Sequence, residues 1–471
     1  MIELTLAEIV ELTGGELAGA ASPGAGGTVV SGSVTLDSRT IAAGDLFVAV
    51  AGERVDGNEF LGAAAAAGAV AALCTRPSDA LPCVVVDDAV DALGRLAAGV
   101  HARLAAGGLV TLALTGSSGK TSTKDLLGQV LAAAGATVSP PGSYNNDIGL
   151  PLTVLSAGAD TRFLVLEMGA RGAGHIARLC RVARPSVGVV LNVGSAHLGE
   201  FGSAEGIAQA KGELVEALPA DGTAVLNADD PRVLGMAPRT RARVVTTGRG
   251  PDADVRAVDV SLDDAARARF TLVAGGEQNP VTLQVVGEHQ VANALSAAAA
   301  TLAVGMSPAA VAAALSAAGP KSRWRMEVDR RPDGVTVIND AYNANPESMR
   351  AALAALVGLP AKRRIAVLGA MGELGPDARA EHERLGRDVA AAGIDLVVAV
   401  GADAVGISDG ASAAGRRAGE ESVHVPDRAA ARALLHPLLG DGDVVLVKAS
   451  RSYGLELLAA DLLGARSEGA A

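Results

Sequence analysis

The stretch "TGSSGKTST" (115–123) decides how this chain is interpreted. It ends in Gly-Lys-Thr like a phosphate-binding P-loop, but the usual pattern G-x-x-x-x-G-K-[ST] would need a glycine where the chain has Leu114. An apolar run precedes it at 109–115, and apolar residues at helical spacing follow over 120–134. A strand, a glycine turn and a helix start in this order direct backbone N–H groups at an anion. We therefore favour a nucleotide phosphate loop over a plain glycine turn that caps a helix.

The same alternation continues on both sides of this loop. Strand-length apolar runs followed by helical periods predict a mostly parallel sheet covered on both faces, which is an α/β fold. A β-rich insert is expected at 253–286. The predicted strands around the loop are 109–115, 163–168, 187–192 and 223–227.

Two joints divide the 471 residues. "AAGG" (105–108) precedes the first strand of the central series, and "AAGPKSRW" (317–324) precedes a second series of strand and helix patterns. A chain of this length exceeds a single core. We predict three domains, with a P-loop-type central domain and a Rossmann-like last domain, at residues 1–106, 107–320 and 321–471.

Composition excludes several classes of protein. The net charge is −12 without a basic stripe, so no nucleic-acid partner is expected. The N-terminus lacks the order of a signal peptide, and the alanine-rich run at 62–74 is too short to span a membrane. Three distant cysteines without a CxxC indicate neither a zinc site nor disulfides. We expect a monomer in the cytoplasm, without membrane insertion.

Polar residues near the loop and at the ends of the next strands are candidates for phosphate and metal chemistry. Lys120 can reach terminal phosphates, and the Thr121 hydroxyl can hold Mg²⁺. Glu167 ends the next strand and is either a second Mg²⁺ ligand or a solvated acid. His197 is either a ligand or an ordinary loop histidine, and Lys211 alone would be a solvated helix lysine.

Taken together, these residues resemble the Mur ligases, ATP-dependent enzymes that form amide bonds in peptidoglycan synthesis. The phosphate loop of that family is the shortened T-G-x-x-G-K-[ST], which "TGSSGKTS" matches. The other matching motifs are "LEMGA" (166–170), "NVGSAHLGEFGS" (192–203), "AKGEL" (210–214), "GEHQVANALSAAAA" (287–300), "SRWRMEV" (322–328) and "NDAYNANPESM" (339–349).

Within that family the chain is most similar to the ligases that join D-alanyl-D-alanine to UDP-N-acetylmuramoyl-tripeptide through an acyl phosphate. This is the last cytoplasmic step of peptidoglycan precursor synthesis. The resemblance implies a uridine-nucleotide-binding α/β first domain as well. The alternative is a related ligase that adds a single amino acid. The motifs that favour the dipeptide ligases are "NNDIGLP" (145–151), "DAYNANP" (340–346), "GAMGELG" (369–375) and "KASRS" (448–452).

Rivals of other classes fit less well. A folylpolyglutamate synthase usually lacks a separate uridine domain, whereas about 100 residues precede the loop here. A nucleotide switch or transport ATPase would carry the usual P-loop pattern. A UDP-sugar-binding protein without catalysis would not need the loop lysine.

The resemblance implies cofactors and roles for single residues. ATP and two Mg²⁺ ions are expected, with Arg325 facing the γ-phosphate and Lys211 carrying a carbamate. Asn293 is expected at the adenine and Asp340 on the ribose side, although Gln290 stands where many relatives carry Asn. The implied catalytic residues are Lys120, Lys211, His197 and Arg325, and the implied metal ligands are Thr121, Glu167, His197 and Lys211.

The implied binding residues fall into two sets. ATP is expected on Thr115, Gly116, Ser117, Ser118, Gly119, Lys120, Thr121, Ser122, Asn293, Arg325 and Asp340. The UDP-peptide and D-alanyl-D-alanine are expected on Ser38, Arg39, Asn145, Asn146, Tyr342, Asn343, Asn345, Ser450 and Arg451.

Overall fold

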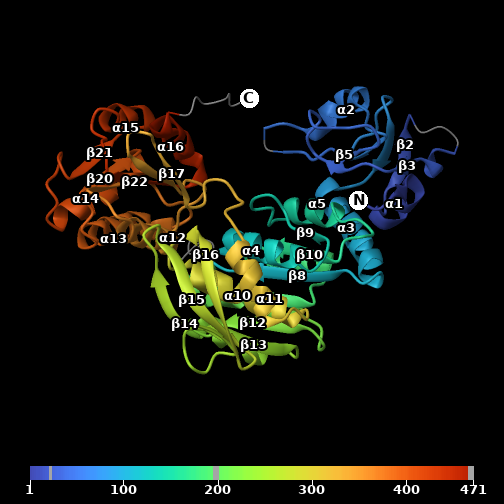
Figure 1. The fold of residues 1–471 in the computed structure, drawn as a ribbon. Helices are drawn as coiled ribbons and strands as arrows, with labels where there is room; N and C mark the ends of the chain where they lie inside the picture. The colour runs from blue at the N-terminus through green and yellow to red at the C-terminus, as the bar shows by residue number, and fades with distance from the viewer. Residues whose placement is uncertain (21–23, 53, 195–200, 465–471) are drawn as a thin grey trace.

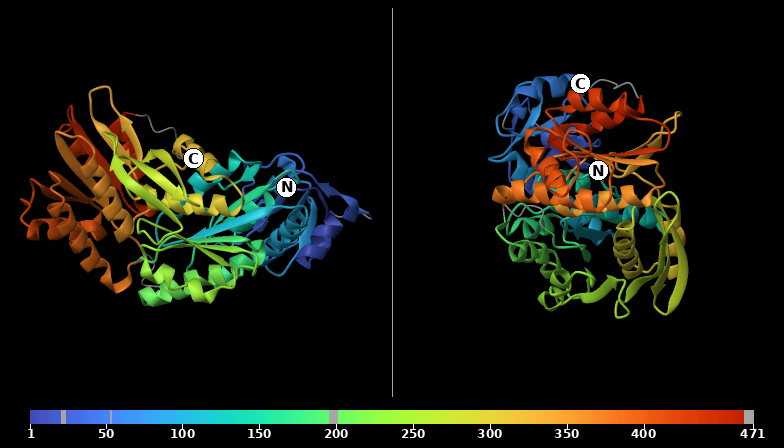
Figure 2. Two further views of the ribbon diagram at one scale, coloured as in Figure 1. Left: turned by 60° about the horizontal axis from the view of Figure 1, so that its bottom comes forward. Right: turned by 90° about the vertical axis from the view of Figure 1, so that its left-hand side faces the viewer.

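The computed structural model describes residues 1–20, 24–52, 54–194 and 201–464. Three lobes follow one another along the chain, and each is built around one sheet (Figure 1). The first and last lobes lie at opposite ends of the central lobe (Figure 2). Within the described residues, no helix has the length and apolar character needed to cross a membrane.

The first lobe has a sheet in the order β2-β7-β6-β5-β4, with β2 antiparallel to β7 and the other pairs parallel. A short antiparallel pair, β1-β3, lies beside it, and α1 begins with a capping box between Thr5 and Glu8. Its elements are β1 (Leu4–Thr5), α1 (Leu6–Thr13), β2 (Glu16–Gly19), β3 (Val29–Val30), β4 (Val34–Thr35), β5 (Leu46–Val48), α2 (Leu61–Ala67), β6 (Ala71–Cys74), β7 (Pro82–Val85) and α3 (Ala89–Ala106).

The central lobe confirms the predicted parallel sheet. Its order is β16-β15-β14-β13-β12-β11-β8-β10-β9, and β8 lies between β11 and β10. The strands from β9 to β14 are parallel, while β14, β15 and β16 form antiparallel pairs. The predicted β-rich insert therefore extends the parallel sheet at one edge.

The helices and strands of this lobe have the following bounds. The strands are β8 (Val110–Thr115), β9 (Thr137–Val138), β10 (Phe163–Glu167), β11 (Val187–Val190), β12 (Thr223–Asn227), β13 (Arg243–Gly248), β14 (Val255–Leu262), β15 (Arg267–Ala274) and β16 (Glu277–Val286). The helices are α4 (Lys120–Ala132), α5 (Gly149–Leu155), α6 (His175–Ala183), α8 (Ala204–Glu216), α9 (Pro231–Leu234), α10 (Gln290–Ala303) and α11 (Pro308–Ala317).

The last lobe has a sheet in the order β17-β18-β22-β19-β20-β21, parallel except for the antiparallel pair β17-β18. Alternating strands and helices of this kind match the predicted Rossmann-like pattern. Its elements are β17 (Glu327–Arg330), β18 (Thr336–Asn339), α12 (Pro346–Gly358), β19 (Arg363–Gly369), α13 (Ala378–Ala391), β20 (Leu396–Val400), α14 (Val405–Ala413), β21 (Ser422–Val425), α15 (Arg428–Leu435), β22 (Asp443–Lys448) and α16 (Leu455–Leu463).

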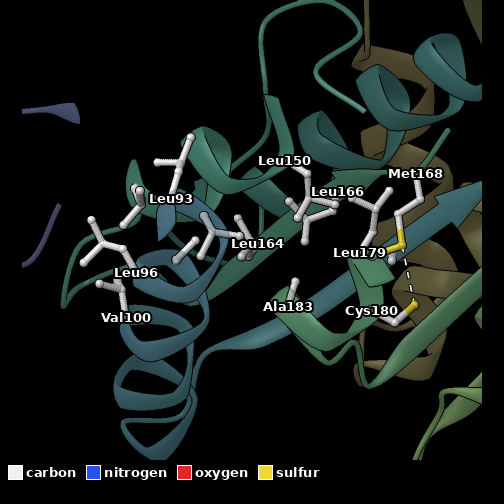
Figure 3. Packing of buried hydrophobic residues seen from close by; sticks show 14 of the residues in the cluster. Leu93, Leu96, Val100, Leu150, Leu164, Leu166, Met168, Leu179, Cys180 and Ala183 are labelled. Atoms are coloured by element: carbon white, nitrogen blue, oxygen red, sulfur yellow. Dashed lines mark hydrogen bonds between the residues drawn. The ribbon is translucent and has the colours of Figure 1, made fainter. Parts of the chain in front are cut away.

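One helix, α3, belongs to two packed layers at once. Its buried side chains Leu93, Leu96 and Val100 share a single core with residues of α5, β10 and α6, as Figure 3 shows. The same core contains residues of the first lobe, such as Leu46 and Leu73. Because each fully buried leucine contributes about 2 kcal/mol, α3 fastens the first lobe to the central sheet.

The opposite face of the central sheet is covered by α4 and α10. The buried face of α10 is rich in alanine, and it packs against α4 in a second core. Small side chains allow the two helices to approach closely. This packing fixes the start of α4, where the phosphate loop ends.

Candidate active site

The predicted phosphate loop occupies residues 116–119, between the end of β8 and the start of α4. The Thr115 hydroxyl donates a hydrogen bond to the backbone oxygen of Met168 at 2.8 Å, which holds the end of β8 to the next strand. Gly119 has a φ of 79°, and a Cβ there would lie 2.5 Å from Oδ1 of Asn293. Glycine is therefore required at this position, both for the left-handed backbone and for the close approach of α10.

Asn192 holds the loop from the neighbouring strand. Its Oδ1 accepts hydrogen bonds from the amides of Ser117 and Ser118 at 3.0 and 2.9 Å, and its Nδ2 donates to the Ser118 oxygen at 3.1 Å. These two amides are thus turned toward protein, whereas the first amides of α4 have no partner within the helix and remain for an anion. Asn192 was not predicted as a site residue, although it closes the predicted strand beside β8.

The Lys120 side chain folds back over the loop. Its Nζ donates to the backbone oxygen of Gly116 at 2.7 Å. Burial lowers the pKa of the Lys120 amine; the carboxylate of Glu167 opposes this shift, and the positive charge of Arg325 adds to it. An arriving polyanion would favour the charged form of this amine.

Glu167 is a buried carboxylate held by neutral donors. Its Oε2 accepts from the Thr121 hydroxyl at 2.9 Å, and its Oε1 accepts from Ser143 Oγ at 2.8 Å and Asn145 Nδ2 at 2.7 Å. Two hard oxygen atoms, of Thr121 and Glu167, therefore lie together beside the loop. This donor set fits Mg²⁺, which takes few protein oxygens and completes its shell with water and phosphate. Ser143 was not predicted.

Lys211 lies on α8, buried with only 4% of its surface exposed. Burial lowers its pKa well below the usual range, and the positive charge of Lys120 adds to the effect. The interpretation of Lys211 as a solvated helix lysine is therefore wrong. His197 falls outside the described residues, so its metal role stays a prediction.

Arg325 reaches the loop from the segment that enters the last lobe. Its Nη2 donates to Thr121 Oγ1 at 3.2 Å, and its guanidinium lies 4.1 Å from the centre of the Tyr342 ring. The flanking residues Trp324 and Met326 have φ angles of 59° and 53°. A left-handed backbone on both sides of one side chain is strained, and such strain occurs at functional sites.

Both carboxylate oxygens of Asp340 accept hydrogen bonds from other residues of the protein. Oδ1 accepts from the amide of Met326 at 3.1 Å, and Oδ2 accepts from Lys448 Nζ at 2.6 Å. Lys448 is also buried and donates to the backbone oxygen of Asn343 at 2.8 Å. Removing either partner of this pair would strand a buried charge at a cost of about 3–5 kcal/mol. No role was predicted for Lys448, although it begins the quoted "KASRS" motif.

Two neighbouring cavities, of about 220 and 200 Å³, meet at the loop. They share Ser118, Gly119, Arg325 and Ser348. The predicted residues that line the first are Ser117, Ser118, Gly119, Lys120, Thr121, Asn145, Asn146, Glu167, Arg325, Tyr342, Asn343 and Asn345. Those that line the second are Ser118, Gly119, Ser122, Asn293, Arg325 and Asp340.

The last lobe also closes on the loop through Asn345. This side chain caps α12 and donates from Nδ2 to the Ser117 oxygen at 3.3 Å. Asn146 likewise combines two positions, since it lines the first cavity and accepts the amide of Gly149 at 2.8 Å at the start of α5. Glu373, which was not predicted, lines the first cavity from a left-handed backbone.

Four predicted substrate residues lie outside both cavities. Ser450 Oγ accepts the amide of Gly372 at 2.8 Å. The guanidinium of Arg451 lies 4.3 Å from the centre of the Trp324 ring and forms an ion pair with Glu456. In the first lobe, Arg39 is exposed and pairs with Asp37 at 2.9 Å, and Ser38 lies next to this pair.

Models of one protein family cover most of the chain. Residues 32–101 match the catalytic domain of the Mur ligase family, residues 114–301 the Mur ligase middle domain, and residues 324–451 the glutamate ligase domain of Mur ligases. The chain belongs to the Mur ligase family. As a Mur ligase it has the three-domain α/β architecture that the sequence predicted. It uses ATP to form a peptide bond.

Two relatives with the same name are similar to this Mur ligase over nearly the whole chain. It is 49% identical to the UDP-N-acetylmuramoyl-tripeptide–D-alanyl-D-alanine ligase of Mycobacterium tuberculosis, over 98% of this chain and 97% of that protein. The ligase of the same name from Escherichia coli is 36% identical, over 97% of each chain.

Solved structures agree with these relatives. MurF from Acinetobacter baumannii superposes with a TM-score of 0.88 at 33% identity, over 98% of this chain and 99% of that one. MurF ligase from Thermotoga maritima in complex with ADP superposes with a TM-score of 0.78 at 30% identity, over 92% and 97% of the two chains.

Proposed function

We propose that this Mur ligase joins D-alanyl-D-alanine to UDP-N-acetylmuramoyl-tripeptide, with conversion of ATP to ADP and phosphate. The observation that carries the proposal is the 49% identity, over 98% of the chain, to a ligase that bears this name. The geometry agrees, because Lys120 and Arg325 approach one phosphate loop from two different lobes.

The reaction needs an activated carboxyl group, because a carboxylate alone has no leaving group better than oxide. The peptide carboxylate attacks the γ-phosphorus of ATP, the bond to the β-γ bridging oxygen breaks, and ADP leaves. The neutral amine of the dipeptide then attacks the acyl phosphate, and phosphate departs as the amine nitrogen loses its proton. Lys120 and Arg325 supply positive charge where these anions meet, and the loop fixes their placement.

The oxygen pair of Thr121 and Glu167 supports a requirement for Mg²⁺. We assign them to one Mg²⁺, which when bound contributes charge neutralisation at the phosphates. Lys211 suits a second site, because burial lowers the pKa of its amine and so favours the neutral form, which can add CO₂ and lose a proton to become an anionic carbamate. His197 is kept as a further proposed ligand.

We assign the two cavities to different substrates. The second suits the nucleoside, since Asn293 and Gln290 present amide groups there and are hydrogen-bonded to each other at 2.8 Å. Asp340 lines it on the side of the last lobe and organises Lys448, so a ribose contact would add to that role. We assign the phosphates to the boundary between the cavities, because Ser118 and Gly119 line both.

The first cavity suits the acyl phosphate and the dipeptide. Asn145 and Asn146 approach from the central lobe, and Tyr342, Asn343 and Asn345 approach from the last lobe. Ser38 and Arg39 are assigned to the uridine nucleotide in the first lobe. Ser450 and Arg451 lie outside the cavity and would contact the dipeptide only after a movement of their loop.

Phosphate release from ATP tests the proposal directly. We expect release when UDP-N-acetylmuramoyl-tripeptide and D-alanyl-D-alanine are both present, with the pentapeptide product seen by mass spectrometry. Omission of either substrate should abolish it. Equal turnover with a single amino acid would replace the proposal by the alternative ligase, and ATP turnover without the UDP-peptide would contradict both.

A further inference from the structure

The segment that connects the central and last lobes lies along α4 and is attached to it at three points. Gln129 Nε2 donates to the Gly319 oxygen at 2.9 Å, and its Oε1 accepts the Gly319 amide at 3.1 Å. Asp125 Oδ2 accepts the amide of Ser322 at 3.1 Å. The third point is the contact between Arg325 and Thr121 at 3.2 Å.

These contacts form a regular ladder between antiparallel segments. The helix residues are four apart, at 121, 125 and 129, and the partners are three apart, at 325, 322 and 319. Residues four apart lie on one face of a helix and rise about 6 Å. Three residues of extended chain span up to about 10 Å, which is more than the rise of the helix between two contacts. The left-handed turn at Trp324 shortens the segment to match the helix. The ladder therefore fixes which residue faces Thr121.

The middle rung is held firmly. Asp125 is buried, and its Oδ1 lies 2.8 Å from the amine of Lys124. Lys124 is fully buried and donates to the backbone oxygens of Pro140 and Gly142 at 2.6 and 2.9 Å. The carboxylate of Asp125 thus pairs with Lys124 through Oδ1 and with the amide of Ser322 through Oδ2.

We propose that Asp125 and Gln129 are positioning residues that set the register of segment 319–325 on α4 and so hold Arg325 at the reacting phosphate. The inference rests on the proposed function, because it takes Arg325 as the γ-phosphate contact. A slip of one residue would displace Arg325 by about 3 Å, more than phosphoryl transfer tolerates. ADP lacks the γ-phosphate that Arg325 is assigned to contact, so ADP binding reports on the loop apart from this register.

Turnover in a double-mutant cycle tests the proposal. Gln129→Leu keeps the volume of the side chain and removes both hydrogen bonds, so we expect kcat to fall about tenfold with an unchanged Kd for ADP. In an Arg325→Ala background the same change should alter the residual rate by less than about twofold, because the group that it positions is absent. Equal losses in both backgrounds would overturn the proposal.

Asp125 provides a second arm and a rescue. Asp125→Ala removes the acceptor for Ser322 and the ion-pair partner of Lys124, so kcat should fall at least as far as in Gln129→Leu, whereas Asp125→Asn keeps an acceptor for Ser322 and should retain more of the rate than Asp125→Ala. The matched control is Gln284→Leu, which removes hydrogen bonds to the oxygens of Thr282 and Ser316 without touching the ladder. A rate loss in the control equal to that of Gln129→Leu would overturn the proposal.

Trp324 gives a readout that needs no turnover. It is the one tryptophan in the sequence, and it lies next to Arg325. Acrylamide should quench its fluorescence more strongly in Gln129→Leu than in the wild type or in Gln284→Leu. Unchanged quenching in Gln129→Leu and Asp125→Ala would refute the ladder. If turnover of the wild-type protein did not depend on the dipeptide, the proposed function would be refuted instead. The quenching result would still test the contacts between the segment and α4.

Discussion

The guanidinium of Arg325 donates a hydrogen bond to the hydroxyl of Thr121 at 3.2 Å, although 204 residues separate the two along the chain. Thr121 belongs to the first turn of α4, and Arg325 lies where the chain enters the last lobe. The predicted phosphate site is therefore built from residues of two lobes. Loop residues and the residues that reach them from the last lobe should then fail in different ways when they are changed.

Replacing Lys120 by alanine should remove turnover and leave the fold intact. Among the described residues the amine donates a hydrogen bond only to the backbone of its own loop, so its loss costs little stability, but the reacting phosphate loses a positive charge. We expect phosphate release to fall about 10³-fold or more. Lys362→Ala is the control, because that lysine is exposed and pairs with Asp441. A normal rate in Lys120→Ala would refute the assignment of the loop.

Loss of Lys211 should be repaired by a small carboxylate. Lys211→Ala removes the group that can form a carbamate, so activity should nearly vanish and return in part with formate or acetate at high concentration. The amine has the lowered pKa that CO₂ addition needs, and ¹³C-labelled bicarbonate should give a carbamate signal in the wild type that is absent from the variant. Full activity of Lys211→Ala without additive would rule the carbamate out.

Metal dependence should follow Glu167. Chelation by EDTA is expected to stop turnover, and added Mg²⁺ is expected to restore it. In Glu167→Gln the half-saturating Mg²⁺ concentration should rise at least about tenfold, because one charged oxygen beside Thr121 is lost. Glu383→Gln, which changes a half-buried acid of the last lobe that pairs with Arg379, should respond to Mg²⁺ as the wild type does. The same Mg²⁺ response in both variants would contradict the assignment.

Acid should loosen the contact between α3 and the central sheet. His101 of α3 is buried against the Thr111 hydroxyl of β8 at 2.8 Å, and burial lowers its pKa from 6.5 to about 4. Between these values the unfolded chain binds a proton that the folded protein does not. Stability from this group is therefore present above pH 6.5 and is lost as the pH falls toward 4, by about 3 kcal/mol at most.

The variant His101→Gln removes this titration. Its unfolding midpoint should change less between pH 6.5 and 4 than that of the wild type, when both are followed by thermal unfolding. His436→Gln, at an exposed site, should keep the wild-type pH dependence. A wild-type slope in His101→Gln would show that acid acts elsewhere.

Local patterns predicted much of the central lobe, because buried parallel strands and a glycine turn leave clear signatures. The strand before the loop and the helix after it were expected at 109–115 and 120–134, and the structure has β8 (Val110–Thr115) and α4 (Lys120–Ala132). The short strand β21 (Ser422–Val425) was not predicted, since its alternation of His and Ser with valine carries little apolar signal.

Side-chain partners were harder to predict than positions. Polar residues at strand ends can be read from a sequence, but the acceptor that each one finds depends on tertiary packing. Asn192 and Ser143 illustrate this, since both hold predicted site residues through hydrogen bonds that no spacing reveals. Asp340 was expected to face the ribose, and the structure adds its buried partner Lys448.

Because α3 packs against both the first lobe and the central lobe, it limits where the lobes of two such enzymes can be joined in a chimera. In a chimera that takes residues 1–106 from another chain, α3 comes from that chain as well. The side of α3 that packs on the central lobe would then have to fit the residues of α5, β10 and α6 of this protein. A crossover just ahead of Asp88, the residue that caps α3, would leave that fit untouched. Domain shuffling in the laboratory should therefore be more successful when the first lobe is swapped without its last helix.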